Sequence, residues 1–291
     1  MSSIVTKRND LVEAPYDNKF MGQYIAPVLK VSQESGTFYF QKTQSDTSGV
    51  RSKGDAMTAN IAAPGKVAYE CAIVYENKLV PTQDEGEVDE ISLVGDAKTS
   101  VTAKIEALIA GVLAAIEDPT PIKADIVAGI ATARRAIASK AVSGKNALIL
   151  SESNFQTLFA DADISAVAAK FNVAYSPDLP GGGDAQLLAR ALGFDVCLVI
   201  ADAYATATET TIFVAKIPAN TADAKSSVQL MRTLTKGNGD SLWNVEQYAN
   251  GTNGGDQYTV SSYCVPKLLN SDLVIALDIN AEVPVVPPVG G

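Results

Sequence analysis

Histidine is absent from all 291 residues of this sequence. It is the side chain that most often acts as a general base near neutral pH, and it is the commonest metal ligand. Its absence excludes Ser-His-Asp and Cys-His catalytic sites and leaves only carboxylates and thiols for a metal site. Most hydrolase mechanisms are therefore excluded, and we expect a structural protein and not an enzyme. An acidic soluble enzyme that works with carboxylates is the alternative.

Cysteine is scarce as well. The three cysteines, Cys71, Cys197 and Cys264, lie far apart in the sequence. An odd number of widely spaced cysteines without a CxxC pair indicates neither a disulfide framework nor a zinc site. We therefore expect free thiols in a reducing compartment, and neither a metal nor a cofactor.

Positive charge is in short supply, with 23 Lys and Arg against 33 Asp and Glu and a net charge of −10. A protein that grips nucleic acid through its phosphates needs clustered basic residues, so that class is excluded. A protein that only encloses DNA is compatible with this charge.

Long apolar runs are also missing. The longest, residues 107–116, is about half of what a bilayer-spanning helix needs. The first 20 residues lack the apolar core of a signal peptide. We expect a soluble protein with no membrane partner.

The strongest periodic pattern lies in residues 97–117, AKTSVTAKIEALIAGVLAAIE. Its large apolar residues recur in steps of four, three, one, three and four, which predicts an amphipathic helix with one buried face. They are Val101, Ile105, Leu108, Ile109, Val112 and Ile116. Asp96 or Thr99 is expected to cap this helix, and Asp118 followed by proline to end it.

A second helical pattern follows almost at once. Thr120 is expected to cap it, with Pro121 as its first residue and Gly144 at its C-terminal end. The residues expected on its apolar side are Ile122, Ile126, Ile130, Ala133 and Ile137.

Before the helices, the alternating pattern of two segments predicts paired strands. The first is TFYFQK at 37–42, and the second is KVAYECAIVYENKLV at 66–80. Residues 37–77 thus read as a long two-stranded ribbon with a polar tip. An isolated hairpin is marginal in water and needs a partner. That partner is either another molecule or a larger sheet of the same chain.

Five acidic residues crowd into seven positions after the ribbon, and two basic residues lie at the ribbon tip. The acidic residues are Asp84, Glu85, Glu87, Asp89 and Glu90, and the basic pair is Arg51 and Lys53. The calcium-loop spacing is absent from the acidic run. Opposite charges steer an approaching surface and select its register. Our hypothesis is that these seven residues form a contact between subunits; the alternative is that both segments are simply solvated.

The back half mixes helices and strands. Strands are expected at 146–151, 196–200, 210–217, 226–235, 242–248, 257–265 and 271–279. Ser153 with Gln156 suggests a capping box, and Asp163 a further cap. Gly181-Gly182-Gly183 is not a phosphate loop, because Asp184 follows where such a loop carries Lys and Ser or Thr.

The order of these elements resembles the major capsid protein of tailed bacteriophages. The resemblance starts with an arm ending in YIAPVLKV, a TFYF strand, a polar excursion, a returning KVAYECAIVYENKLVP strand and a long helix. It continues through NALILSESNFQTLF, LARALGFDVCLVIADAY and YTVSSYCVPKLLNSDLVIALDIN. It covers nearly the whole chain and contains no catalytic signature.

The resemblance implies an α+β fold with an N-terminal arm, an extended β-hairpin loop, a peripheral domain with a long spine helix, and an axial domain. The implied parts are the arm (1–30), the extended loop (31–80), the peripheral domain (81–147), the axial domain (148–255), returning strands (256–280) and a flexible tail (281–291). In this fold the arm and the loop overlie neighbouring subunits, which would give the ribbon its partner.

The resemblance also implies a function. Members of the family assemble into hexamers and pentamers, which close into an icosahedral shell around double-stranded DNA. The expected location is the virion, after assembly in the host cytoplasm, with portal, scaffold or decoration proteins as further partners. A cellular nanocompartment shell of the same fold, enclosing enzymes instead of a genome, is the alternative.

Overall fold

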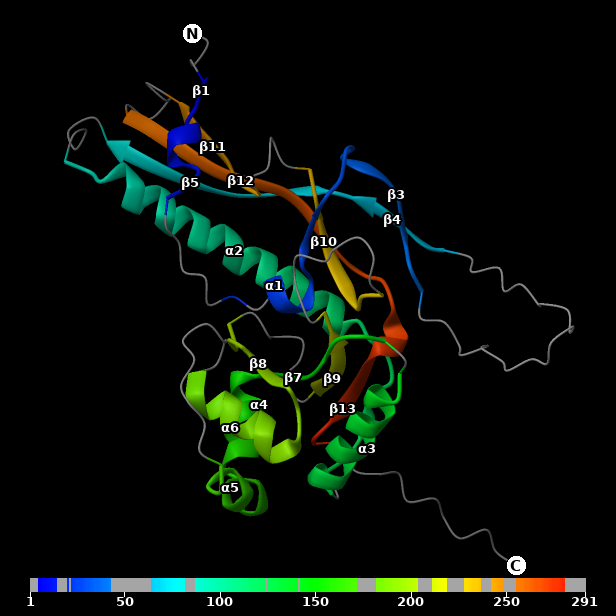
Figure 1. Cartoon of the computed structure of the whole chain (residues 1–291). Helices are drawn as coiled ribbons and strands as arrows, with labels where there is room; N and C mark the ends of the chain where they lie inside the picture. Colours follow the sequence, from blue (N-terminus) through cyan, green and yellow to red (C-terminus); the bar gives the residue numbers. More distant parts are fainter. Residues whose placement is uncertain are drawn as a thin grey trace, which may run out of the picture.

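The computed structural model describes residues 5–14, 20, 22–42, 64–81, 87–123, 125–140, 142–171, 182–203, 211–218, 228–236, 242–248 and 255–280. Two sheets lie along the length of the molecule, and a two-stranded ribbon extends from one side (Figure 1). The chain is therefore a mixed α+β protein, as the sequence predicts. Among the described residues, no helix combines the length and apolar character needed to span a membrane.

The upper sheet has six strands and carries the longest helix on one face (Figure 1). Its strands are β1 (Val5–Lys7), β2 (Val28–Lys30), β5 (Ala72–Pro81), β10 (Met231–Thr235), β11 (Asn244–Tyr248) and β12 (Gly255–Leu268). The helices of this part are α1 (Gly22–Ile25), α2 (Glu90–Ala114) and the short 3-10 turn η1 (Asn9–Leu11). Strand β12 is central, because it pairs with β5 along one edge and with β11 and β10 along the other.

The lower sheet has five strands in the order β6-β13-β9-β7-β8. They are β6 (Thr120–Pro121), β7 (Lys145–Ser151), β8 (Val196–Ile200), β9 (Thr211–Ile217) and β13 (Val274–Asp278), with η3 (Ser271–Leu273) leading into β13. Its helices are α3 (Ile126–Ala138), α4 (Glu152–Phe159), α5 (Ala162–Ala168) and α6 (Gly182–Leu192).

Both faces of the lower sheet are buried. In β7, Ala147 and Ile149 face the core shared with α2, while Leu148 and Leu150 face the core under α3 to α6. A strand covered on both sides reads as a continuous apolar run, which is why the NALILS segment shows no alternation. The lower sheet is therefore a middle layer between two cores.

Helix α2 begins and ends earlier than its sequence pattern predicts. Asp89 is the N-cap, and its carboxylate accepts a hydrogen bond from the Ile91 backbone N–H at 3.1 Å. Asp96 and Thr99, the expected caps, lie inside the helix. The start of α2 is hard to recognise in the sequence, because Asp89 belongs both to the acidic run and to the helix terminus.

The buried face of α2 also differs from the predicted stripe. Leu108 is 43% exposed, whereas Leu113 is fully buried. The buried positions are Val94, Ala97, Lys98, Val101, Ile105, Glu106, Ile109, Ala110 and Leu113. These positions recur close to the 3.6-residue period of a helix. Two of them, Lys98 and Glu106, are charged. A stripe predicted from apolar residues alone omits both, and it therefore lies slightly to one side of the buried face.

Three buried charged side chains bind the backbone of the N-terminal segment. Lys98 donates from Nζ to the carbonyls of Val12 and Ala14, the latter at 3.0 Å. Glu106 accepts from the Gly22 backbone N–H. In the upper sheet, Arg232 lies 3.4 Å from the Pro27 carbonyl. A buried charge is tolerated only when it is hydrogen-bonded, so the described residues 12–14 and 22–27 are part of the folded core.

The expected position of the arm over neighbouring subunits stays a prediction. Its described parts, residues 5–14 and 22–30, pack on their own subunit, with β1 antiparallel to β11 and β2 parallel to β10. A Cβ on Gly22 would come within 2.6 Å of both Glu106 and Ile109, so a larger residue at this position would require the ends of these two side chains to move.

Three further helix starts predicted from sequence are wrong. Helix α3 is capped by Asp125 and not by Thr120, because Thr120 and Pro121 pair with β13 as β6. Helix α4 is capped by Ser151 and not by Ser153, and helix α5 by Asp161 and not by Asp163. Each error is a few residues long, and each arose because several capping residues lie close together.

The ribbon is shorter than predicted. Strand β3 (Ser35–Phe40) pairs with β4 (Gly65–Glu70), and the chain then changes partner at Cys71. Strand β5 pairs with β12 over ten residues and belongs to the upper sheet. The period-2 pattern runs through both strands without a break, so it does not reveal that the partner changes.

The two sheets divide the chain differently from the predicted domain ranges in one respect. Strands β10 and β11, which fall within 148–255, belong to the upper sheet with α2. After β12, which belongs to the upper sheet, the chain returns to the lower sheet and forms β13 there. The ranges themselves stay a prediction.

The stripe on α2 is tested by a matched pair of substitutions. Leu113→Asp places a charge at a fully buried position and should lower the free energy of unfolding by several kcal/mol. Leu108→Asp changes a side chain that is 43% exposed and should cost less than about 1 kcal/mol. Urea unfolding of the purified subunits measures both values, and equal losses would contradict the assignment.

The role of the N-terminal segment is tested by removing residues 1–14. The shortened chain leaves the Lys98 ammonium buried without two of its acceptors, which should cost about 3–5 kcal/mol. Adding Lys98→Met removes that charge and should recover a large part of the loss. Urea unfolding midpoints compare the two chains, with Lys104→Met as an exposed control. A loss that is the same with Lys98 or methionine would show that this contact is unimportant.

Candidate intersubunit surfaces

The structure describes three of the seven residues predicted to form a contact between subunits. Arg51, Lys53, Asp84 and Glu85 lie outside the described residues. Glu87 is exposed just before α2, Asp89 is the helix cap, and Glu90 is its first residue. The structure thus brings the end of the acidic run to the N-terminus of the spine helix.

Asp89 has a complete role within the subunit. Its carboxylate accepts hydrogen bonds from the Ile91 backbone N–H and, at 2.7 Å, from the Ser92 hydroxyl. These bonds, the one from Ser92 above all, hold the pKa of Asp89 below its usual value. A carboxylate at a helix N-terminus is also favoured by the helix dipole.

Glu90 connects the spine helix to the sheet and to the N-terminal segment. It accepts hydrogen bonds from the Tyr258 hydroxyl at 2.5 Å and from Arg8 Nη2 at 2.8 Å. The bond from Tyr258, followed by the bond from Arg8, lowers the pKa of Glu90. Burial, reinforced by the bond to Glu90, raises the pKa of Tyr258. Both groups keep their normal charge at neutral pH.

Arg8 is the centre of this cluster, which we call the arm anchor and define as Arg8, Asp10, Glu90, Gln247 and Tyr258. The Arg8 guanidinium also donates to Asp10 at 2.7 Å and to Gln247 at 2.8 Å. It lies over the Tyr258 ring, 5.9 Å from the centroid. The bond to Asp10 is the main reason why the pKa of Arg8 is raised. The anchor fixes β1 against β11 and the start of α2.

The arm anchor was not predicted from the sequence. Arg8 is 82 residues from Glu90 and 239 residues from Gln247, so no local pattern connects them. The available signal was the position of Glu90 directly after a capping aspartate. Two acidic residues of the predicted contact, Asp89 and Glu90, are thus already engaged within the subunit.

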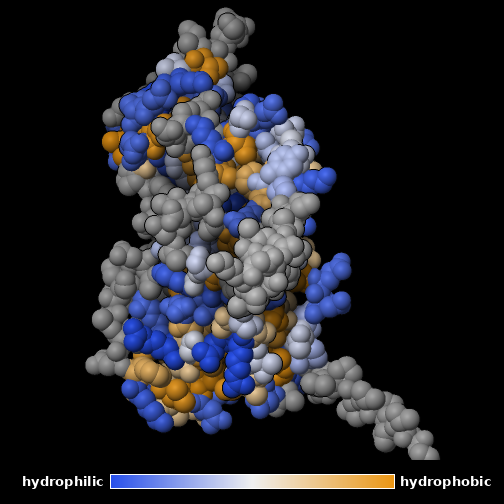
Figure 2. All heavy atoms as spheres, turned by 45° about the vertical axis from the view of Figure 1, so that its right-hand side comes forward, coloured by the Kyte–Doolittle hydropathy of each residue, from blue (hydrophilic) through white to orange (hydrophobic). Residues whose placement is uncertain are grey.

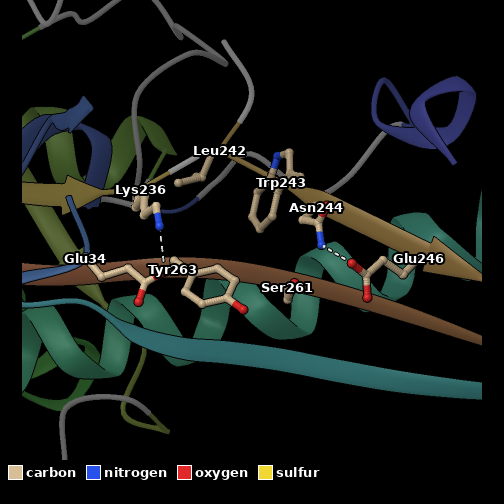
Figure 3. Close-up of a pocket in the computed structure, with 8 residues that line it drawn as sticks. All are labelled: Glu34, Lys236, Leu242, Trp243, Asn244, Glu246, Ser261 and Tyr263. Atoms are coloured by element: carbon tan, nitrogen blue, oxygen red, sulfur yellow. Dashed lines mark hydrogen bonds and ion pairs between the residues drawn. The ribbon is translucent and has the colours of Figure 1, made fainter. Parts of the chain in front are cut away.

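A groove opens on the face of the upper sheet that is turned away from α2 (Figure 3). It holds about 180 Å³ and is lined by Glu34, Lys236, Leu242, Trp243, Asn244, Glu246, Ser261 and Tyr263. Lys236 pairs with Glu34 at 2.6 Å across one end, and Asn244 donates to Glu246 at 2.9 Å at the other. The bond from Asn244, then that from Tyr248, lowers the pKa of Glu246. The groove thus offers an aromatic wall with polar ends.

A second, more open groove of about 410 Å³ runs between β5 and α2. Its apolar lining includes Ile73, Tyr75 and Leu108, which are 52%, 53% and 43% exposed. Lys104 crosses it and donates to Glu76 at 2.9 Å and to the Tyr75 carbonyl at 2.8 Å. Among the described strands, β5 pairs only with β12, so its outer edge is open to an additional chain.

The acidic and thiol side chains of the described residues are scattered. The described residues contain no group of three His, Cys, Asp or Glu that could hold a metal ion. Burial raises the pKa of the Cys71 thiol, and that of Cys264 to about 11, so both are protonated at neutral pH. Exposed apolar side chains beside polar ones, visible on the surface in Figure 2, are instead typical of interaction surfaces.

This chain is similar to known proteins in its fold and not in its sequence. No family model and no curated protein matches this sequence. Solved structures match over nearly the whole chain. A phage-related protein of Bordetella bronchiseptica RB50 matches with a TM-score of 0.67 and 14% identity, over 96% of this chain and 98% of its own.

Two further structures show the range of the likeness. The capsid of cyanophage P-SCSP1u matches with a TM-score of 0.56 and 12% identity, over 89% of this chain and 88% of that one. An encapsulin complex of Synechococcus elongatus PCC 7942 matches with a TM-score of 0.52 and 10% identity, over 88% and 87%. This chain therefore has the α+β fold of tailed-phage major capsid proteins. The resemblance seen in the order of its elements is confirmed at the level of the fold.

The arm anchor predicts a specific pH dependence of stability. The pKa of Glu90 is lowered in the folded protein, so its contribution is present above its ordinary pKa of 4.5 and is lost as the pH falls through the lower folded value. Glu90→Gln should therefore reduce the difference in unfolding free energy between pH 6 and pH 3. Tyr258→Phe, which removes the main donor, should act in the same direction. Urea unfolding at both pH values measures this, and unchanged differences in both variants would contradict it.

Proposed function

We propose that this protein is the shell-forming subunit of a capsid, assembling into hexamers and pentamers of an icosahedral shell that encloses double-stranded DNA. The observation that carries the proposal is the match of the whole chain, 96% of it in one case, to a phage-related protein and to phage capsids. The shell is located in the virion and assembles in the host cytoplasm. Portal, scaffold or decoration proteins are its further partners.

The physical character of the chain supports a structural role. With a net charge of −10, the subunit has little tendency to bind incoming DNA, which leaves the polymer free to move inside a shell. The described residues offer grooves and an open strand edge, which are features of protein contacts. The upper sheet with α2 corresponds in this proposal to the peripheral domain, and the lower sheet with α3 to α6 to the axial domain.

A nanocompartment shell that encloses enzymes is the second candidate. It is supported by the match to the encapsulin complex, at a TM-score of 0.52. The two functions share a fold and differ in cargo. Particles purified from cells that express the chain with its neighbouring genes distinguish them, because one kind contains nuclease-protected DNA and the other a stoichiometric enzyme.

The ribbon supplies a contact between subunits in this proposal. Strands β3 and β4 lead away from the body of the molecule, and Tyr39 on the ribbon is 64% exposed. The tip residues Arg51 and Lys53 would reach the acidic run of a neighbour. Because Asp89 and Glu90 are engaged within their own subunit, the landing site consists mainly of Asp84, Glu85 and Glu87.

Electron microscopy of the purified protein tests shell formation, and charge reversal tests the tip. The wild-type chain should form closed particles of uniform size. Arg51→Glu with Lys53→Glu should reduce the yield of particles, and Glu85→Lys with Glu87→Lys in the same chain should partly restore it. The double variant Lys30→Glu, Lys145→Glu, which makes the same change in net charge, is the control.

Three outcomes would count against these ideas. A wild-type protein that stays monomeric over a wide range of concentration and salt would contradict the proposed function. Normal assembly of the tip variant would contradict the tip contact alone. A combined variant that assembles less well than the tip variant would show that the acidic run has a different partner.

A further inference from the structure

The helices of the lower part form one layer with two distinct ends. Helices α3, α4, α5 and α6 all contribute to the same core against the lower sheet. Helix α6 lies between α5 and α3. It packs on α5, and at its C-terminal end the Gly193 carbonyl accepts a hydrogen bond from Arg134 of α3 at 2.8 Å. Figure 1 shows α5 at the lower left of the molecule and α3 at the lower right. The two helices therefore expose their outer faces on different sides.

The outer face of α3 carries an apolar residue and a basic one. Ile130 and Ile137 are fully buried, which directs the opposite side of the helix to solvent. Arg135 is exposed on that side in the last turn, and Val127, which is 40% exposed, lies near the N-terminal end on the flank of the helix. A cation in the last turn is favoured by the helix dipole.

The outer face of α5 carries the complementary set. Ile164 and Ala168 are buried, while Val167 is 38% exposed and Phe171, just after the helix, is 41% exposed. Asp163 lies exposed in the first turn, where the dipole favours an anion. This end therefore presents apolar side chains beside an acidic residue.

The order of the charges fits two helices that run antiparallel. With Arg135 at the C-terminal end of α3 placed beside Asp163 at the N-terminal end of α5, the N-terminal end of α3 lies beside the C-terminal end of α5. Asp125 and Lys170 are exposed at those second ends. The charges are roughly 15 Å apart on α3 and roughly 10 Å apart on α5, so the two pairs do not fall into register at once, and the pair of Arg135 and Asp163 is the one placed in contact. Lys123, next to Asp125, weakens only the second pair.

We propose that α3 of one subunit packs antiparallel on α5 of the next, with Arg135 opposite Asp163 and with Val127 beside Val167 and Phe171. The partner is a second copy of this chain. Because the two faces differ, the contact is head-to-tail, and a head-to-tail contact that closes on itself makes a ring. This inference rests on the proposed function and names the surface that joins subunits within one capsomer.

Charge reversal at this contact tests the proposal. Arg135→Asp places two carboxylates opposite each other, and Asp163→Arg places two guanidinium groups opposite each other. Each variant should need at least about tenfold more protein than the wild type for half-assembly into rings, measured by native mass spectrometry or sedimentation velocity. Lys145→Asp, which reverses an exposed charge elsewhere in the lower part, should assemble as the wild type does. Near-ultraviolet circular dichroism verifies that all variants are folded.

Mixing the two single variants gives a sharper test. In a ring where Arg135→Asp and Asp163→Arg subunits alternate, every contact joins opposite charges, either in the native sense or reversed. Alternation is possible only in rings with an even number of subunits. The mixture should therefore recover hexamers and not pentamers, whereas the double variant in one chain should recover both.

The possible outcomes separate the contact from the function. Wild-type rings together with unimpaired single variants would overturn the contact and leave the proposed function standing. A mixture that recovers neither ring, or recovers hexamers and pentamers alike, would also overturn the contact. A wild-type chain that forms no ring at any concentration would overturn the proposed function itself.

Discussion

The rest of the structure depends on the hydrogen bonds made by two charged side chains that are buried on the spine helix α2. Lys98 is 1% exposed and Glu106 is 6% exposed, and the two lie eight positions apart on α2. They are too distant to neutralise each other directly, since eight residues span roughly 12 Å. Both instead bind the backbone of the N-terminal segment, and burial lowers the pKa of Lys98. The core under α2 is therefore complete only when this segment is docked.

That requirement explains how the parts of the chain are arranged. The N-terminal segment supplies two strands of the upper sheet, β1 beside β11 and β2 beside β10, both on the side of β12 that is opposite β5. The ribbon begins next to this segment, and its strand β4 continues into β5 of the upper sheet. The lower part carries its helices in one layer and exposes different surfaces at α3 and α5. An anchored ribbon and a two-ended layer suit a subunit that makes several contacts at once.

Much of the fold was predictable, because strong local patterns specify it. The capsid-like order of elements, the TFYF ribbon strand, the NALILS strand and the long helix are all present. The candidate site was less predictable. The acidic run is a local feature, yet the roles of Asp89 and Glu90 depend on a helix start and on Arg8 and Tyr258, which are remote in sequence. Arg51, Lys53, Asp84 and Glu85 lie outside the described residues, so their contact stays a prediction.

By itself, the sequence determined the main helices and strands without their exact starts, the lack of histidine-based chemistry and the acidic balance, because these follow from composition and short-range periodicity. Only the tertiary structure decided which strands pair. The alternating pattern is the same in β4 and β5, yet they join different sheets, because a strand's period records which residues share a face and not which neighbour it meets. It also decided that Lys98 and Glu106 face inward, since a charge can be buried where distant backbone groups arrive to bind it.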